Sequence, residues 1–239
     1  MELAIRAWLS VAYRRWSRKR LDVWDSRRGL IRRFAPGRTF LDFGGMWSVA
    51  GEVGFLAEAA GASRVMLADV MDPTEEFETK RRERESAIEY THAELGTPAT
   101  TEGLGAFDVV WCTGVLYHTP DPIGQLMHLR QLTREYLVLG SVIAPEVPGL
   151  PQACVFYPQL PEPARMPVAR ALGAPETRVG LGTPFDYSPV GWFANYWWGI
   201  TPSALRAMLV TASFEVVEEY RVAPFMMDVV ARPVNRRSG

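Results

Sequence analysis

The sequence lacks several features that would assign a protein at once. No apolar run approaches the ~20 residues that a membrane-spanning helix needs. The first twenty residues are interrupted by Arg6 and Arg14, which does not fit the continuous apolar core of a signal peptide. We therefore expect a cytoplasmic protein without a membrane partner.

Cysteine and histidine are scarce. The two cysteines, Cys112 and Cys154, are too few for a disulfide framework. The three histidines, His92, His118 and His128, are not spaced with one another or with a cysteine as metal ligands are. We predict no metal site.

The net charge is only −1, but the charge is unevenly distributed. Residues 1–38 hold eleven lysine and arginine residues and only three acidic ones. Such a basic arm suits an anionic partner, for example RNA or an acidic carrier protein. A solvated helix face explains the same residues without a partner, and we favour this second interpretation.

Two helices are predicted in this basic arm. Residues 2–19 place apolar side chains at three- and four-residue spacing, which is typical of an amphipathic helix. Two tryptophans on its stripe suit packing against the main domain or against a second subunit, so we expect a monomer or a homodimer. A second helix is predicted over residues 26–34, with Ser26 as its N-cap. Residues 1–37 would then form a helical cap.

Strand-like and helix-like segments alternate along most of the remaining chain. Such alternation with short connections predicts a parallel sheet covered by helices on both faces. Thr201 as N-cap and Pro202 at the first helical position begin a later helix, which two closing strands follow. We predict an α/β, Rossmann-like sheet of seven mostly parallel strands. The predicted strands are 39–42, 64–69, 87–91, 107–112, 136–143, 214–221 and 225–232, and the helices are 51–60, 74–86, 123–133 and 203–211.

Residues 144–190 interrupt this alternation with ten prolines and no clear period. A long irregular stretch inside a compact domain is usually functional, for example an active-site lid. We therefore assign residues 38–239 to one domain, with 144–200 as a lid or substrate insertion.

The stretch FLDFGGMWSVAGEVG, residues 40–54, joins a strand to a helix as nucleotide-cofactor loops do. A dinucleotide's pyrophosphate needs glycines at fixed offsets, yet Met46 occupies one of them. S-adenosylmethionine (SAM) has no phosphate, and its amino-acid tail needs only a tight turn and a nearby carboxylate. Asp69, which ends the second strand, suits ribose hydroxyls. The sequence therefore favours SAM, and a dehydrogenase is the weaker alternative.

These features resemble the class I SAM-dependent methyltransferases, over roughly residues 38–143 and 200–232. The resemblance is carried by LDFGG, MLAD and FDVVWCTGVLYHTPDP, and by an acid after the third strand. It departs from the family in a longer first loop and in a glutamate where aspartate is commoner. The resemblance implies a methionine-tail site at Asp42, Gly44 and Gly45, a ribose site at Asp69 and an adenine site near Glu94, to which we add Trp47, Cys112 and Thr113 as cofactor-binding residues.

The segment after the fourth strand, VLYH followed by proline, is most similar to enzymes that methylate or carboxymethylate wobble uridines in transfer RNA. By that resemblance, Tyr117 and His118 would face the sulfonium and the acceptor. A histidine can remove the acceptor's proton, and an aromatic face can stabilise a sulfonium cation. A structural role for His118 is the open alternative, and we interpret His92 and His128 as structural.

An aromatic cluster, NYWWG, lies before the last predicted helix. Its position after the proline-rich stretch favours a substrate-binding wall formed by Asn195, Tyr196, Trp197 and Trp198. Packing of the same residues onto the hydrophobic core is the structural alternative.

We therefore predict a biosynthetic, SAM-dependent methyltransferase that acts on oxygen or nitrogen of a small molecule. One alternative keeps the fold but transfers or cyclises the aminocarboxypropyl group, releasing methylthioadenosine, or uses a carboxylated SAM. Abundant aromatics and few obvious general bases favour this alternative. A third hypothesis is an enzyme that binds transfer RNA through the basic arm. Residues 144–190 lack the lysine and arginine density of a nucleic-acid groove, so we do not expect a nucleic-acid partner.

Overall fold

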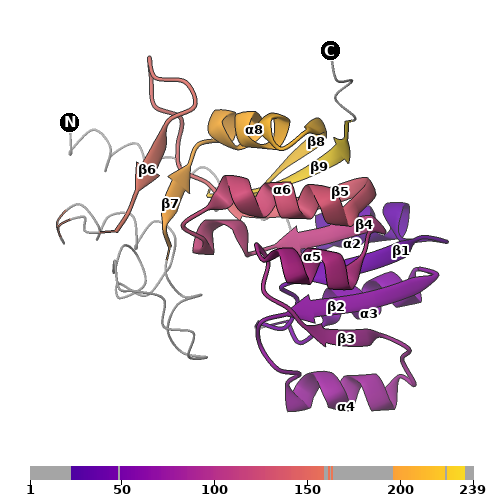
Figure 1. Cartoon of the computed structure of the whole chain (residues 1–239). Helices are drawn as coiled ribbons and strands as arrows, with labels where there is room; N and C mark the ends of the chain where they lie inside the picture. The colour runs from indigo at the N-terminus through magenta and orange to yellow at the C-terminus, as the bar shows by residue number, and fades with distance from the viewer. Residues whose placement is uncertain are drawn as a thin grey trace.

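The computed structural model describes residues 23–47, 49–158, 161, 163, 196–223 and 225–234. Its main strands are β1 (Thr39–Phe43), β2 (Arg64–Asp69), β3 (Glu89–His92), β4 (Phe107–Thr113), β5 (Thr133–Val142), β8 (Phe214–Ala223) and β9 (Met226–Pro233). They form one seven-stranded sheet in the order β3-β2-β1-β4-β5-β9-β8 (Figure 1). The strands β1 to β5 pair in parallel, whereas β9 runs antiparallel to β5 and β8. The predicted Rossmann-like, mostly parallel sheet is confirmed.

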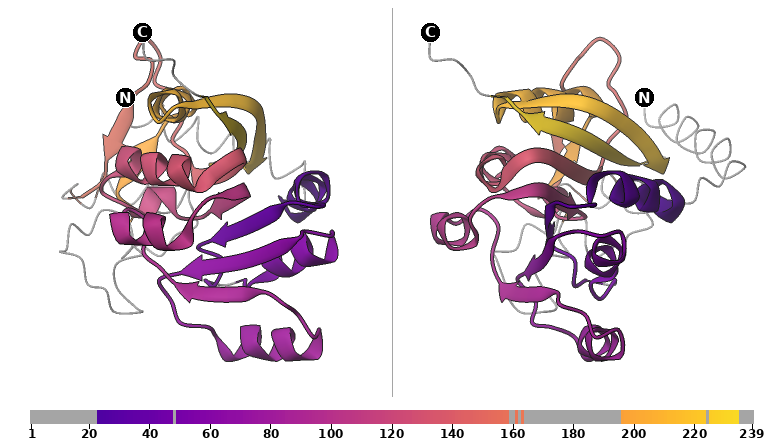
Figure 2. Two further views of the ribbon diagram at one scale, coloured as in Figure 1. Left: turned by 45° about the vertical axis from the view of Figure 1, so that its right-hand side comes forward. Right: turned by 90° about the vertical axis from the view of Figure 1, so that its right-hand side faces the viewer.

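Helices cover both faces of this sheet (Figure 2). One layer holds α2 (Val23–Phe34), α3 (Glu52–Ala59) and α4 (Glu75–Glu83), and the other holds α5 (Pro98–Leu104), α6 (Pro122–Leu132) and α8 (Pro202–Thr211). Successive strand residues point to opposite faces, so Phe40 and Leu41 of β1 belong to two different hydrophobic cores. Within the described part of the chain, no helix is long and apolar enough to cross a membrane.

Helix α2 packs directly on the sheet. Leu30, Ile31 and Phe34 are buried in the same core as β1. The prediction of Ser26 as the N-cap is wrong, because the helix already begins at Val23. Packing of Trp24 against the core extends the apolar stripe by one turn towards the N-terminus. The helix predicted over residues 2–19 lies outside the described residues.

Local capping explains where several helices begin. The hydroxyl of Thr201 accepts a hydrogen bond from the Ala204 N–H at 3.3 Å, with Pro202 at the first helical position, as predicted. Helix α5 was missed, although Thr97 caps it by the same Thr-Pro pattern.

The region predicted as a lid contains regular structure where it is described. Strands β6 (Cys154–Phe156) and β7 (Trp198–Ile200) form a separate antiparallel pair that the sequence did not predict. The pair lies on the side towards which β2 and β4 point (Figure 1). Most of residues 159–195 lie outside the described part, so the lid itself stays a prediction.

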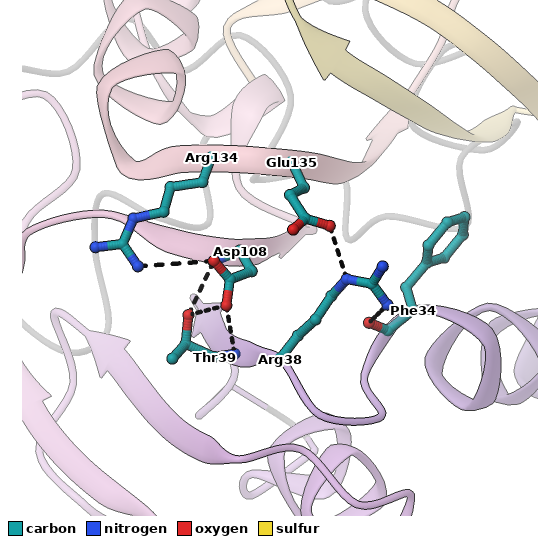
Figure 3. Close-up of polar contacts among 6 residues, drawn as sticks. All are labelled: Phe34, Arg38, Thr39, Asp108, Arg134 and Glu135. Atoms are coloured by element: carbon teal, nitrogen blue, oxygen red, sulfur yellow. Dashed lines mark hydrogen bonds and ion pairs between the residues drawn. The ribbon is translucent and has the colours of Figure 1, made fainter.

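Polar side chains at the amino ends of β1, β4 and β5 bind one another (Figure 3). The Asp108 carboxylate accepts hydrogen bonds from the Thr39 N–H at 2.9 Å and from its hydroxyl at 2.8 Å, and Arg134 approaches it at 3.6 Å. Arg38 donates to Glu135 at 2.8 Å. These contacts join the strands at the edge formed by their amino ends. At the opposite edge, formed by the carboxyl ends, polar groups line two cavities instead.

Candidate active site

Two adjoining cavities lie at the carboxyl ends of β1, β2 and β4. The larger cavity has a volume of about 240 Å³ and is lined by residues that include Asp69 and Glu94. The smaller cavity, of about 210 Å³, is lined by residues that include Asp42. Gly44, Trp47, Gly114 and His118 line both. In an open α/β sheet this edge is where ligands bind, so the two cavities form one candidate cleft.

The D-F-G-G turn needs both of its glycines. Gly44 has a φ of +81°, and a Cβ there would clash with the Cγ2 atom of Val115. A Cβ at Gly45 would clash with the carboxylate of Asp42. The turn therefore brings bare backbone close to the end of β1 and to the segment after β4.

Met46, which stands where a dinucleotide loop carries glycine, is a core residue. Its side chain is 1% exposed, and its N–H donates to the Asp69 carboxylate at 2.8 Å. The next residue, Trp47, points the other way, because it is 46% exposed and lines both cavities. Met46 thus holds the loop against the core, while Gly45 and Trp47 on either side of it line the cleft.

Asp69 has two roles at the end of β2. One carboxylate oxygen accepts the Met46 N–H and the other accepts the Met71 N–H at 2.9 Å. Burial raises the pKa of Asp69, and these backbone hydrogen bonds oppose that rise. Each carboxylate oxygen can accept more than one hydrogen bond. Asp69 therefore holds the loop and still offers acceptors to the larger cavity.

Asp42 is a buried carboxylate on the wall of the smaller cavity. Burial and the nearby charge of Asp69 raise its pKa from 3.8 to about 7, while the Gly54 N–H and the charge of Arg27 act in the opposite direction. Among the described residues, its Oδ2 atom is buried without a hydrogen-bond partner. An acceptor in this position suits a cationic donor, such as an ammonium group.

The wall of the larger cavity away from Asp69 comes from the segment after β3 and from α6. Glu94, which the resemblance assigns to the adenine site, lies on this wall. Gln125, which the sequence analysis missed, donates weakly to the Leu95 carbonyl at 3.4 Å, and its Oε1 is buried without a partner in the described structure. His128, interpreted as structural, bonds Thr101 at 2.8 Å and also lines the cavity.

Three aromatic rings form one side of the smaller cavity. Tyr117 and Tyr196 stack with centroids 5.0 Å apart and planes at 11°. The His118 ring lies 4.2 Å from Tyr117 and 5.2 Å from Tyr196, measured between centroids. Tyr117 and His118 belong to η1 (Leu116–His118), a single 3₁₀ turn directly after β4. Burial raises the pKa of the Tyr117 hydroxyl, so this group stays protonated at neutral pH.

Other predicted residues lie elsewhere. Cys112 is 1% exposed and belongs to the core, and it lines neither cavity. Trp197 and Trp198 also line neither cavity, and the Trp198 indole donates to the Pro120 carbonyl at 3.0 Å. Asn195 lies outside the described residues. The predicted residues on the cavity walls are Asp42, Gly44, Gly45, Trp47, Asp69, Glu94, Thr113, Tyr117, His118 and Tyr196.

Arg27 of α2 is a cavity residue that the sequence analysis did not identify. It was counted in the basic arm and interpreted as part of a solvated face. In the structure it is buried, lines the smaller cavity and pairs with Asp228 of β9.

No protein-family model and no curated protein sequence matches this chain. Solved structures do match in fold. The N-terminal domain of EvdMO1, with S-adenosylhomocysteine (SAH) bound, is 19% identical, with 90% of this chain and 82% of that chain covered and a TM-score of 0.57. The 1,6-didemethyltoxoflavin N1-methyltransferase of Burkholderia thailandensis, with SAH bound, is 15% identical, with 98% and 89% covered and a TM-score of 0.59.

The fold is that of the class I SAM-dependent methyltransferases. The same fold is found in the [4+2]-cyclase SpnF, which is 14% identical, with 88% of this chain and 81% of that chain covered and a TM-score of 0.56. A class I fold therefore does not fix the reaction, and the function has to be argued from the site.

Proposed function

We propose that the protein is a SAM-dependent methyltransferase acting on an oxygen or nitrogen of a small molecule. The observation that carries the proposal is the buried Oδ2 of Asp42, which lies beside the Gly44-Gly45 turn and has no hydrogen-bond partner within the described residues. The smaller cavity, which Asp42 lines, adjoins the larger cavity, which has Asp69 and Glu94 on its wall. The didemethyltoxoflavin methyltransferase, named for a small-molecule acceptor, supports this acceptor class.

The residues present fit SAM in both cavities. Asp69 offers carboxylate acceptors for ribose hydroxyls in the larger cavity, and Glu94 and Gln125 offer acceptors for the adenine amino group. Asp42 offers an acceptor for the ammonium group of the amino-acid tail in the smaller cavity. Because SAM has no pyrophosphate, its binding does not need a glycine at position 46, and Met46 can fill its place in the core.

When bound, SAM supplies a methyl group on a sulfonium centre and leaves as SAH. The protein's task is to align the acceptor with that group and to accept the acceptor's proton. His118 lies on the wall common to both cavities, so its ring nitrogen would take the proton released by an O–H or N–H acceptor. Trp47 and Tyr117 would present aromatic faces to the sulfonium.

Product analysis tests this proposal. Purified protein would be incubated with SAM alone and with SAM plus a small-molecule extract, and the nucleoside products identified by mass spectrometry. SAH formed only with extract is the expected result. Methylthioadenosine above the non-enzymatic background would overturn methyl transfer in favour of the aminocarboxypropyl alternative. Asp69→Asn should lose the activity, and Asp72→Asn, whose side chain is 93% exposed, is the matched control.

A further inference from the structure

Arg27 and Asp228 form a buried ion pair between the first described helix and the last strand. The Arg27 Nε donates to one Asp228 oxygen at 2.8 Å and its Nη2 donates to the other at 2.9 Å. Arg27 is 8% exposed and Asp228 is fully buried. The two residues are 201 positions apart in the sequence, so only the folded chain brings them together.

Stability is a weak reason for such a pair. Removing two charges from water costs about as much free energy as their attraction returns, so buried pairs often add little net stability. Asp228 uses two of the five N–H donors that a guanidinium carries. The arginine also lines the smaller cavity, which suggests a ligand for this side chain.

The guanidinium group of Arg27 lies at the edge of the sheet where the carboxyl ends of the parallel strands meet. A Cβ built at Gly140 of β5 would come within 2.9 Å of the Arg27 Nη2 and 2.8 Å of the Thr113 Cγ2. Arg27 is therefore close to the end of β4, where the cleft begins. Its charge also lowers the pKa values of Asp42 and Tyr117, which places both groups within its field.

The smaller cavity thus has opposite charges on its wall. Asp42 supplies a carboxylate oxygen without a partner in the described structure, and Arg27 supplies a cation. An α-amino acid carries the complementary pair, an ammonium and a carboxylate. The methionine tail of SAM is such a group.

We propose that Arg27 binds the carboxylate of the methionine tail, with Asp228 as the residue that positions its guanidinium. This inference rests on the proposed function. Arginine presents planar, paired N–H donors that match a carboxylate, which makes it better suited than lysine to this role. The ion pair would then join α2 and β9 around the bound cofactor.

Calorimetry with two ligands tests the inference. SAH carries the amino-acid tail and methylthioadenosine lacks it. In Arg27→Met, SAH affinity should fall about tenfold or more, as expected for the loss of a charged hydrogen bond. Methylthioadenosine affinity should stay within about twofold. Arg28→Met is the matched control, because Arg28 is a neighbouring arginine that pairs with Asp25 at the surface, and it should leave both affinities unchanged.

A second variant controls for the possibility that Arg27→Met unfolds the protein. Arg27→Met leaves Asp228 buried without its partner, which can destabilise the fold strongly. Arg27→Met combined with Asp228→Leu removes both charges and should show the same selective loss of SAH. Unchanged SAH affinity, or an equal loss for both ligands, would overturn the inference. A wild-type protein that binds neither ligand would overturn the proposed function as well.

Discussion

Replacing Asp42 by asparagine should stabilise the protein at pH 8 and weaken its binding of SAH. The folded protein holds the Asp42 proton more tightly than the unfolded chain does, because the pKa rises from 3.8 to about 7 on folding. Between these two values the folded state binds more protons, so this group's contribution to stability falls as the pH rises. At pH 8 the carboxylate is ionised in both states, and the buried charge destabilises the fold.

The size of this effect follows from the two pKa values. The interval from 3.8 to about 7, at about 1.36 kcal/mol per pH unit, corresponds to about 4 kcal/mol. Asparagine keeps an oxygen that can accept the Gly54 N–H, but burying its amide costs about 1–3 kcal/mol. We therefore expect a net gain of about 1–3 kcal/mol in the free energy of unfolding at pH 8, or about 2–12 °C in melting temperature.

The same substitution should change how SAH binding depends on pH. An ammonium group bound by Asp42 needs the ionised carboxylate, so binding releases a proton below pH 7. Wild-type affinity should therefore fall about tenfold for each pH unit below 7. His118, His128 and Asp69 line the cavities in both proteins, so only the part of the slope that disappears in the variant belongs to Asp42.

Thermal unfolding at pH 8 and calorimetric titration with SAH between pH 5.5 and 8 measure both effects. A variant that melts at a lower temperature than wild type at pH 8 would show that the buried charge is compensated. An identical pH slope in the two proteins would remove Asp42 from the ammonium site.

Three further substitutions test other parts of the site. Gly44→Ala should lower the free energy of unfolding in urea by about 1–3 kcal/mol, because its φ is +81° and its Cβ would meet a side chain. In Gly103→Ala the added Cβ would meet no atom within 4 Å in the described structure outside the backbone of α5, so this substitution should not lower the free energy of unfolding. An equal loss in both variants would refute the steric argument. Asp69→Asn should weaken SAH at least about tenfold by calorimetry, and unchanged affinity would argue against a ribose contact. His118→Gln should reduce kcat about 10²- to 10⁴-fold with SAH affinity within twofold if His118 is the base. Unaltered kcat would favour its structural role.

Most of the sheet could be predicted from the sequence, and so could the part of the site that the strand ends form. Buried strands that alternate with helices have one common arrangement, and the carboxyl ends of parallel strands meet at one edge. Residues at or next to strand ends, such as Asp42, Asp69 and Thr113, could therefore be assigned to the cleft from chain position alone. Cys112 was included by the same logic, but its side chain belongs to the core between the sheet and α5, α6 and α8.

Contacts between segments that are distant in the sequence could not be predicted from local sequence patterns. Arg27 looked like one more exposed arginine, because its partner Asp228 lies at the other end of the chain. Gln125 carries no motif, and only the approach of α6 to the segment after β3 brings it to the cavity. Strands β6 and β7 pair across an intervening stretch without a periodic pattern, so neither was visible locally.

We propose that the cleft binds SAM through its amino-acid tail and its adenosine. Titration calorimetry of wild-type protein with SAH, and separately with NAD⁺, tests it most directly. SAH should bind saturably, one-to-one and in the micromolar range or tighter, and NAD⁺ should show no measurable binding. Absent SAH binding, or NAD⁺ binding of equal strength, would show that the cleft is not a SAM site.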